Sequence, residues 1–476
     1  MKKKIRSLIL YTSLAASALM AGYMLLTRFF TLQEVPIFDE LFSMSTATPS
    51  IPFKTVWTTV LLQDVNLPLY NFILRAWAHC VPFTVPWLRV LSVFFSVCTI
   101  PLAWWAAPKK WDTFKKFVFC SLLSGSFVLT AFSNLLRAYP LGVLICCVES
   151  LLALRLLENL QTKTSPSRLL FYGFFGLGFA CAYTHYFCAA LFFITALWLF
   201  INALIYKTQR VQIFTATAVV FLFWVPWVVA TYLSLDHFQQ DWWFQTPLLS
   251  ASWQIFELLL GPASMLVGTV LFVAFGIISV SFHAKNRFAD FQEVWMGLFQ
   301  WGLLILTVSL VSLRYNLWTD RYFVFFLPSL FLILTSLLAH LTKRNVLFIL
   351  LLPLTLYIWV TYSWENWQLR IEDNTGLEVG MKHASEIPGV SDVLFVYDPV
   401  EYKGSARFFI TEYFIPKGSN IKLIPLTHEN EHRIHEHVPV VVPLCSMISL
   451  LNYSTKYNFT IPNDVFAHNG TCVVML

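Results

Sequence analysis

The chain has 476 residues, of which 57% are hydrophobic and only 12% are charged, and its mean hydropathy is +0.65. A soluble globular domain carries about twice that charged fraction, so the composition excludes a soluble protein and indicates one embedded in a membrane. The formal net charge is +6, but its distribution along the chain matters more than its sum, and no nucleic-acid partner is expected.

Apolar runs long enough to cross about 30 Å of hydrocarbon, roughly 20 residues each, recur along the first three quarters of the chain. They predict eleven transmembrane helices, near residues 8–27, 85–107, 117–133, 141–158, 169–183, 187–205, 211–235, 258–284, 296–313, 322–341 and 346–364. The stretch 169–205 is divided in two because its 37 residues are too many for one crossing. The polar segment 183–186 is the expected hairpin tip between the two helices.

Basic residues alternate from one connection to the next, and this alternation sets the orientation. With the N-terminus inside, the inside connections contain most of the basic residues: Lys2, Lys3, Lys4, Arg6, Lys109, Lys110, Lys115, Lys116, Lys163, Arg168, Lys207, Arg210, Lys285, Arg287, Lys343 and Arg344. The pattern predicts a cytoplasmic N-terminus and an extracytoplasmic segment after the last span. The first apolar run is interpreted as a retained anchor, with a cleaved signal peptide as the alternative.

Two outer loops are long enough to hold structure of their own. In the loop 28–84, the stretches 57–62 and 68–74 are amphipathic and too short to span, which predicts interfacial helices. The loop 236–257 contains a Trp-Trp pair at 242–243. Tryptophan at this height is interpreted as an interface anchor, and an aromatic wall for a lipid or sugar is the alternative.

Acidic residues in the first outer loop are candidates for catalysis. Asp39 and Glu40 are adjacent and follow soon after an apolar span. Paired acids suit general-base catalysis or binding of a divalent metal, and solvation at the interface is the alternative. Asp64 is interpreted either as a further catalytic acid or as the cap of the helix that begins at Pro68.

After the last predicted span the pattern changes to short runs typical of buried strands, near 393–397 and 438–442. Pro439 cannot donate a hydrogen bond to a neighbouring strand, so we expect it at the start of its strand or on a sheet edge. The chain is therefore divided into a membrane domain, 1–364, and a small extracytoplasmic α/β domain, 365–476.

Two features of this outer domain leave alternatives open. Cys445 and Cys472 are its only cysteines, and both a disulfide and two separate thiols are compatible with the sequence. The domain also contains three histidines in a short stretch: His432, His435 and His437. Their spacing matches no common zinc site, which favours a solvated segment over a metal site.

Three arginines depart from the positive-inside pattern because they lie at outer ends of predicted helices. Arg137 lies in the short turn 133–140, and Arg314 and Arg321 flank the turn before the tenth span. A guanidinium is the side chain best matched to a pair of phosphate oxygens, whereas the alternative is an arginine that reaches toward lipid headgroups. Their position on the same side as Asp39 and Glu40 favours a phosphate site.

Charged residues inside the predicted spans are scarce, and Glu149 is the main example. A transporter is expected to line a path through the bilayer with polar residues. Here the polar residues gather at one surface, which favours an enzyme acting on a phosphorylated lipid.

Several motifs, taken in order, resemble the GT-C glycosyltransferase superfamily, in the branch of protein O-mannosyltransferases and lipid A aminoarabinose transferases. They are the acid pair at 39–40, Asp-Val-Asn-Leu-Pro-Leu-Tyr at 64–70, Leu-Arg-Val-Leu-Ser at 88–92, Arg-Ala-Tyr at 137–139, Tyr-Thr-His-Tyr at 183–186 and Asp-Arg-Tyr-Phe at 320–323. The resemblance covers about residues 1–340. It implies an all-α polytopic fold and inverting transfer of a sugar from a polyprenyl-phosphate carrier.

The same resemblance implies roles for individual residues. Asp39 would be the general base that deprotonates the acceptor hydroxyl, with Glu40 assisting it or binding the acceptor or a metal. Arg137 and Arg321 would stabilise the lipid-phosphate leaving group, which needs positive charge but no proton. Three further residues in the matched motifs are candidates for substrate binding: Tyr139, His185 and Tyr322.

One departure from the family pattern bears on metal dependence. Relatives commonly have His-Pro-Pro-Leu where this chain has Asn-Leu-Pro-Leu at 66–69. Without that histidine the requirement for a divalent metal stays open, and so does the alternative of a diverged acceptor or an inactive enzyme.

Two rival functions are a flippase or transporter of a lipid-linked sugar and a membrane-anchored assembly protein of the cell envelope. The short inside loops favour a bacterial inner membrane. The expected partners are membrane lipids, the polyprenyl-linked sugar and an acceptor protein, lipid or glycan.

Overall fold

The structure is a computed structural model that describes residues 2–30, 32, 36, 38–57, 67–234, 255, 257, 259–261, 268, 291–313, 317–318, 320–373, 376–396, 415, 419–426, 433, 438–443, 465–468 and 471–475. The chain forms two compact units. The first comprises Met1–Leu32 and Thr46–Ser363, and the second comprises Gln33–Ser45 and Trp364–Leu476.

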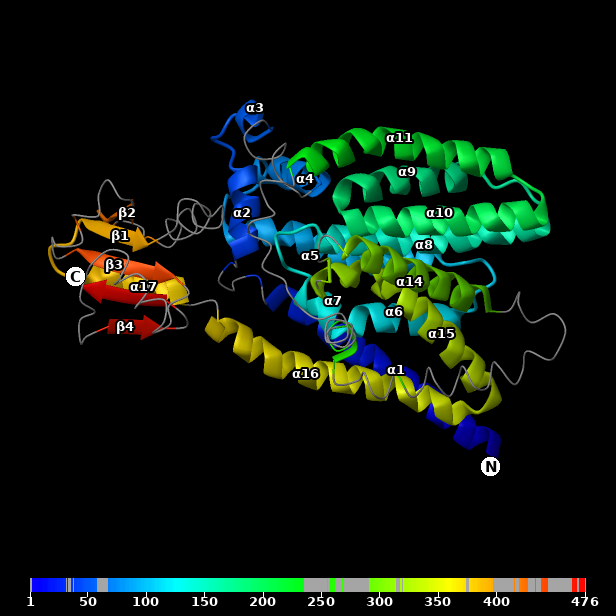
Figure 1. Ribbon diagram of the computed structural model, residues 1–476. Helices are drawn as coiled ribbons and strands as arrows, with labels where there is room; N and C mark the ends of the chain where they lie inside the picture. Colours follow the sequence, from blue (N-terminus) through cyan, green and yellow to red (C-terminus); the bar gives the residue numbers. More distant parts are fainter. Residues whose placement is uncertain are drawn as a thin grey trace. The chain divides into compact units, whose positions relative to one another are not determined.

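The first unit is a bundle of helices (Figure 1). In chain order these are α1 (Lys2–Phe30), α3 (Phe53–Val56), α4 (Leu69–Ala78), α5 (Val85–Ala106), α6 (Thr113–Gly125), α7 (Phe127–Ala131), α8 (Tyr139–Thr162), α9 (Arg168–Thr184), α10 (Tyr186–Tyr206), α11 (Arg210–Ser234), α14 (Gln292–Val311), η7 (Asp320–Phe326), α15 (Leu327–Arg344), η8 (Val346–Leu350) and α16 (Leu351–Asp373). Helix α8 lies at its centre and packs against α5, α9, α10 and α15. Helix α11 is largely exposed along its apolar length, as expected of a helix that faces lipid.

In the part of the chain that the structure describes, eight helices are long and apolar enough to cross a membrane. They coincide with eight of the eleven predicted spans, and the predicted span 169–183 is the shorter helix α9. The predicted span 258–284 lies almost entirely outside the described residues. The prediction of a polytopic helical membrane protein is confirmed.

The predicted span 117–133 is not one helix. Helix α6 ends at Gly125, Ser126 adopts an extended conformation with φ −62° and ψ 122°, and α7 begins at Phe127. The hydroxyl of Ser126 accepts a hydrogen bond from the backbone N–H of Leu129, so this residue caps the second helix. A hydropathy pattern does not reveal such a break, because both helices are apolar.

A polar network connects four helices in the interior of the bundle. The Nε2 of Gln300 donates to Thr195 Oγ1 (2.8 Å) and to Ser150 Oγ (3.4 Å), and its Oε1 accepts from Ser329 Oγ (2.6 Å). Ser150 in turn donates to the carboxyl group of Glu149, which is fully buried. Since lipid offers no hydrogen-bond partners, such contacts hold helices together at membrane depth. The mid-span charge identified in the sequence is thus part of a packing network.

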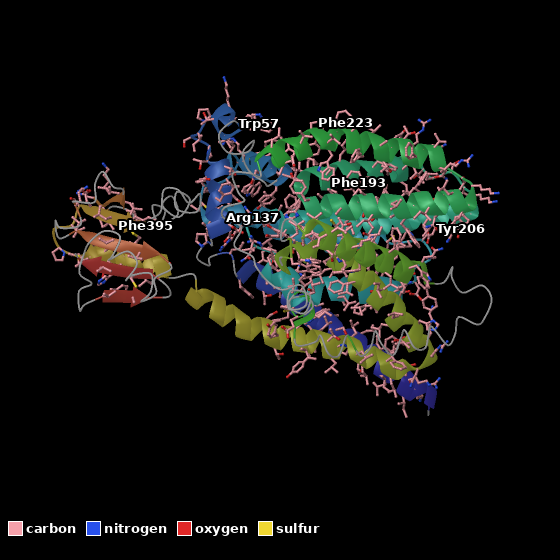
Figure 2. The ribbon with its side chains drawn as sticks, in the orientation of Figure 1. Trp57, Arg137, Phe193, Tyr206, Phe223 and Phe395 are labelled. Carbon is pink, nitrogen blue, oxygen red and sulfur yellow. The ribbon has the colours of Figure 1, made fainter. Side chains whose placement is uncertain are left out.

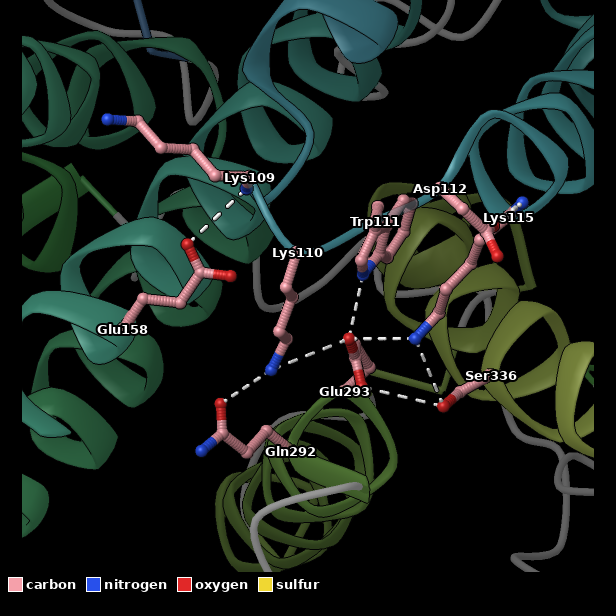
Figure 3. A network of polar contacts seen from close by, with 9 residues as sticks. All are labelled: Lys109, Lys110, Trp111, Asp112, Lys115, Glu158, Gln292, Glu293 and Ser336. Carbon is pink, nitrogen blue, oxygen red and sulfur yellow. Dashed lines mark hydrogen bonds and ion pairs between the residues drawn. The ribbon is translucent and has the colours of Figure 1, made fainter. Parts of the chain in front are cut away.

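A buried ion pair, Glu293 with Lys115, lies at the end of the bundle opposite to the start of α8 (Figure 3). Glu293 is fully buried, and its Oε1 accepts hydrogen bonds from Lys115 Nζ (2.9 Å) and Trp111 Nε1 (2.7 Å). Its Oε2 accepts from Ser336 Oγ at 3.4 Å, while Lys110 lies 3.9 Å from Oε1. These contacts join the connection between α5 and α6 to α14 and α15.

Removing this carboxylate is expected to destabilise the bundle. Glu293→Ala leaves Lys115 and the Trp111 N–H without their buried acceptor, which should lower the free energy of unfolding by about 3 kcal/mol. Unfolding of the purified protein in mixed micelles measures the change. Glu158→Gln is the matched control, because the described contact of that carboxylate is a single 3.3 Å bond to the Lys109 backbone N–H. An equal effect of the two variants would contradict the prediction.

The second unit contains α2 (Phe38–Ala47), whose last residues belong to the first unit, together with α17 (Gly376–Glu386) and a five-stranded sheet. The strands are β1 (Asp392–Val396), β2 (Lys422–Leu426), β3 (Pro439–Pro443), β4 (Val465–His468) and β5 (Thr471–Met475), in the order β2-β1-β3-β5-β4. Strand β1 is parallel to β2 and β3, whereas β5 is antiparallel to β3 and β4. Helix α17 packs on the sheet, where Met381, Val393, Phe395 and Val441 form the core.

The predicted strands near 393–397 and 438–442 are β1 and β3, and Pro439 is the first residue of β3, as expected. Cys472 is disulfide-bonded, whereas the seven other cysteines that the structure describes are free thiols. Other predictions fall on residues that lie outside the described ones: Cys445, His432, His435, His437 and the Trp-Trp pair at 242–243.

Candidate functional site

Five of the predicted site residues come together at one end of the bundle, although they are far apart in the sequence. Arg137 and Tyr139 lie at the start of α8, His185 lies between α9 and α10, and Arg321 and Tyr322 lie in η7. Figure 2 shows Arg137 at this end and Tyr206, the last residue of α10, at the other. The ring of His185 lies 5.0 Å from that of Tyr322 and 6.4 Å from that of Tyr139.

Local sequence explains why the helices begin and end at this point. His185 has extended backbone angles (φ −162°, ψ 147°), which end α9, and its Nδ1 accepts a hydrogen bond from the backbone N–H of Phe187 at 3.2 Å. This residue therefore caps α10. Pro140 stands in the first turn of α8 and Pro328 in the first turn of α15, where proline needs no intrahelical N–H bond.

Aromatic side chains form the floor of this site. The ring of Phe325 is fully buried and lies 4.6 Å from His185 and 5.7 Å from Tyr139, stacked on the latter. Gly142 allows this approach, because a Cβ at that position would lie 2.3 Å from the Phe325 ring. Phe132 lies 5.0 Å from Tyr139 on its edge. The positions of Tyr139 and His185 are therefore fixed by dense packing of rings.

The electrostatics of the site favour an anion. Burial, together with the positive charges of Arg137 and Arg321, lowers the pKa of His185 to about 3. The imidazole is therefore neutral at physiological pH, and because its Nδ1 accepts from Phe187, its Nε2 carries the hydrogen and can donate. Helices α8 and α10 both begin here, and their N-terminal N–H groups add positive potential. The site combines two permanent cations with a neutral donor.

The lowered pKa predicts a specific dependence of stability on pH. Between about pH 6.5 and 3, His185 binds a proton in the unfolded chain but not in the folded one, so acidification lowers the free energy of unfolding by at most about 1.4 kcal/mol per pH unit. His185→Asn keeps a capping side chain for α10 but does not titrate. Thermal unfolding in detergent at pH 7 and pH 5 is expected to show a smaller loss on acidification in this variant. Equal losses in both proteins would contradict the prediction.

Two buried hydroxyl groups, those of Ser92 and Tyr70, fix the turn that carries Arg137. The hydroxyl of Ser92, on α5, donates to the carbonyl of Leu135 at 2.7 Å, and lies 2.8 Å from the hydroxyl of Tyr70 on α4. Ser92 and Tyr70 belong to two of the motifs that carry the sequence resemblance. Both are buried in contacts with protein.

Three further arginines, not considered from the sequence as candidates, are buried in the first unit. Arg75 donates to the carbonyls of Thr46, Thr48 and Ile51 and so holds the described part of the first loop on α4. Arg89 donates to the carbonyl of Leu32 at 3.2 Å. Arg28 was assigned from hydropathy to the outer loop, but it lies inside α1 and is 1% exposed. The sequence signal for Arg28 is its place directly after the first apolar run, 8–27.

The acid pair lies on α2, in the first turn of the helix. Glu40 is fully buried and Asp39 is partly buried. The backbone carbonyl of Asp39 accepts a hydrogen bond from Ser43 Oγ at 3.2 Å. These residues belong to the second unit. Asp64 and Arg314, the remaining candidates, lie outside the described residues.

A resident metal ion has no evident ligand set in the described part of the chain. No group of three or more histidine, cysteine, aspartate or glutamate side chains is arranged there to hold one.

Comparison with known proteins gives structural matches only. No protein-family model and no curated sequence matches the chain. Among solved structures, ArnT from Cupriavidus metallidurans in the apo state aligns with a TM-score of 0.59 and 10% identity over 96% of this chain and 97% of that chain. The same protein bound to undecaprenyl phosphate gives 0.58 and 9% over the same shares. The Archaeoglobus fulgidus oligosaccharyltransferase in complex with Zn and sulfate aligns at only 0.37, with 9% identity over 91% and 68%.

Proposed function

Because the chain has the GT-C fold, as ArnT has, we propose that it is a membrane glycosyltransferase that takes its sugar from a polyprenyl-phosphate donor. The identity to ArnT is 10%, so the shared fold supports a class of reaction, and the site must support the chemistry. ArnT has been seen bound to undecaprenyl phosphate, and a lipid phosphate is the ligand that the cluster of Arg137 and Arg321 would suit.

The observation that carries the proposal is the proximity of two arginines, Arg137 and Arg321, to the neutral His185, where the long helices α8 and α10 both begin. Guanidinium groups match phosphate oxygens in pairs, and helix N-termini favour the same charge. Tyr322 borders the cluster with a partly buried ring that can pack against a sugar, and Tyr139, which is 4% exposed, lines the cluster from within the protein. Arg314 is a third candidate for the phosphate.

In the proposed reaction, an acceptor hydroxyl oxygen forms a bond to the anomeric carbon of the sugar while the bond from that carbon to the phosphate oxygen breaks. The electron pair stays on the polyprenyl phosphate, which leaves as a stable anion. The hydroxyl proton moves to the carboxylate of Asp39, with Glu40 or Asp64 assisting in acceptor binding. Attack from the face opposite the phosphate inverts the anomeric configuration. Arg137 and Arg321 stabilise the charge that develops on the leaving group.

We place this reaction at the extracytoplasmic face of a bacterial inner membrane. The positive-inside pattern supports this orientation, because the turn with Arg137 and the tip with His185 are connections that the pattern assigns to the outside. The acceptor is then a protein, lipid or glycan of the cell envelope. A divalent metal beside the acid pair is compatible with this scheme but not required by it.

The test is sugar transfer by the purified protein in lipid vesicles. Radiolabelled polyprenyl-phosphate sugars would be supplied one at a time, with an extract of cell envelopes as the acceptor. We expect label to move to the acceptor and free polyprenyl phosphate to appear in equal amount. Movement of intact donor across the bilayer without bond cleavage would instead support a flippase. Consumption of none of the donors would contradict the proposal.

A further inference from the structure

We propose that Arg28 is a positioning residue for the donor-phosphate site, because it holds the break between α6 and α7 from which the turn with Arg137 follows. This inference rests on the proposed function, since it treats the Arg137 turn as a phosphate-binding element. In this proposal Arg28 acts without touching the donor, because its four described hydrogen bonds go to protein oxygens.

The side chain of Arg28 connects three helices at one point. Its Nη1 donates to Ser96 on α5, to Oγ at 2.7 Å and to the carbonyl oxygen at 3.3 Å. Its Nη2 donates to the carbonyls of Leu123 (3.1 Å) and Ser124 (3.0 Å) on α6. All four acceptors are neutral oxygens, and the guanidinium is 1% exposed. Burying a cation at this depth is costly unless its contacts serve the structure.

The two carbonyls that Arg28 binds on α6 belong to a helix end. Helix α6 stops at Gly125 because Ser126 leaves the helical conformation, and the acceptors of a last turn lack intrahelical donors. In a membrane-embedded bundle, water does not replace those donors cheaply. The two N–H groups on Nη2 of Arg28 donate to the carbonyls of Leu123 and Ser124 and thereby stabilise the end of α6 at Gly125.

The position of the break decides where the Arg137 turn lies. Helix α7 occupies only Phe127–Ala131, and the turn follows immediately. On α5, Ser92 and Ser96 are one helical turn apart and lie on the same face. Ser92 holds the Leu135 carbonyl of the turn, while Ser96 accepts from Arg28. One face of α5 therefore contacts the Arg137 turn through Ser92 and contacts Arg28 through Ser96.

A small cavity also connects the two regions. It has a volume of about 10 Å³, and Arg28, Ser96, Leu123, Phe132 and Tyr139 are among the residues that line it. Arg28 and Tyr139 therefore border the same space. Leu129 of α7 lines the same cavity, so a shift of α7 after loss of Arg28 would displace Tyr139 and Arg137, which lies two residues before it.

A double-mutant cycle on ligand binding tests this inference. The probe is radiolabelled undecaprenyl phosphate, and the quantity is its Kd for the full chain in nanodiscs. Arg28→Gln is expected to weaken binding about tenfold, since displacement by about 1 Å can reduce site function by up to about 10²-fold. In a background of Arg137→Gln, the same change should add less than about twofold, because both act through one turn. Arg6→Gln, at an exposed position of α1, is the control and should leave Kd unchanged.

Transfer kinetics and a conservative variant separate positioning from general stability. We expect Arg28→Gln to lower kcat/KM for the donor, because a displaced Arg137 stabilises the leaving group less, and this loss should shrink in the Arg137→Gln background. Arg28→Lys keeps the positive charge but loses the forked donors of the guanidinium, so binding of undecaprenyl phosphate should stay weak. If Arg28→Gln fails to fold, Ser96→Ala removes the 2.7 Å contact alone and should weaken binding in the same direction.

Two results would overturn the inference. One is a lower thermal midpoint without a change in Kd, which would make Arg28 purely structural. The other is an equal loss of affinity in the wild-type and Arg137→Gln backgrounds. The proposed function has a separate failure: if Arg137→Gln binds undecaprenyl phosphate as the wild type does, the phosphate site is wrong, and the inference falls with it.

Discussion

Replacing Arg137 and Arg321 together by glutamine is expected to lower the rate of sugar transfer by about 10³-fold or more, because one lost donor to a developing anion already costs about 10²–10³ in kcat. Glutamine keeps a polar side chain of similar length but removes the charge. Since the two arginines act on the same phosphate, the double variant should lose less than the product of the single losses. Release of polyprenyl phosphate from radiolabelled donor measures the rate.

The same double variant should also raise the pKa of His185, which is expected only if both arginines lie beside this histidine. With both charges removed, their part in lowering the pKa of His185 disappears, so that pKa rises toward its ordinary value. A proton NMR titration of a sample with labelled histidine would detect this rise. Arg168→Gln, which changes an exposed arginine at the start of α9, is the control for both readouts. Transfer at the wild-type rate in the double variant would refute the phosphate assignment.

Asp39→Asn is expected to lower kcat for transfer by about 10²–10⁴-fold, which is the usual contribution of a positioned general base. The amide has nearly the shape of the carboxylate but cannot accept the hydroxyl proton. Binding of undecaprenyl phosphate should be unchanged, because in the proposed scheme Asp39 contacts the acceptor. Single-turnover transfer and equilibrium binding, measured on the same preparation, separate the two effects.

Asp392→Asn is the matched control for this change, because it neutralises another aspartate of the second unit, one paired with Arg433 at 2.6 Å. It should leave transfer within about twofold of the wild type, as expected of a partly exposed ion pair. If Asp39→Asn transfers sugar as fast as the wild type, Asp39 is not the base. Glu40→Gln and Asp64→Asn would then be measured in the same way.

The sequence by itself determined the class of protein and much of the helical pattern. Apolar runs of about 20 residues have few alternatives to membrane helices, because an unpaired backbone is too costly in lipid. The division of the stretch 169–205 into two helices was correct, because 37 residues are too many for one crossing. The predicted hairpin tip lies at His185, between α9 and α10. Pro439 at the start of β3 followed from its missing N–H. The sequence also identified Arg137, Tyr139, His185, Arg321 and Tyr322 as residues at helix ends.

Only the tertiary structure decided which of these ends meet and what holds them there. The buried position of Arg28, its contacts to the last turn of α6 and the Glu293 ion pair all involve residues 68 or more positions apart. Hydropathy averages over neighbours in the chain, so it assigned Arg28 to a loop and α6 with α7 to one span. The lowered pKa of His185 likewise arises from two arginines that are remote in sequence but near in space. Local pattern specifies helices, whereas the chemistry of a site depends on which side chains the packing of those helices brings together.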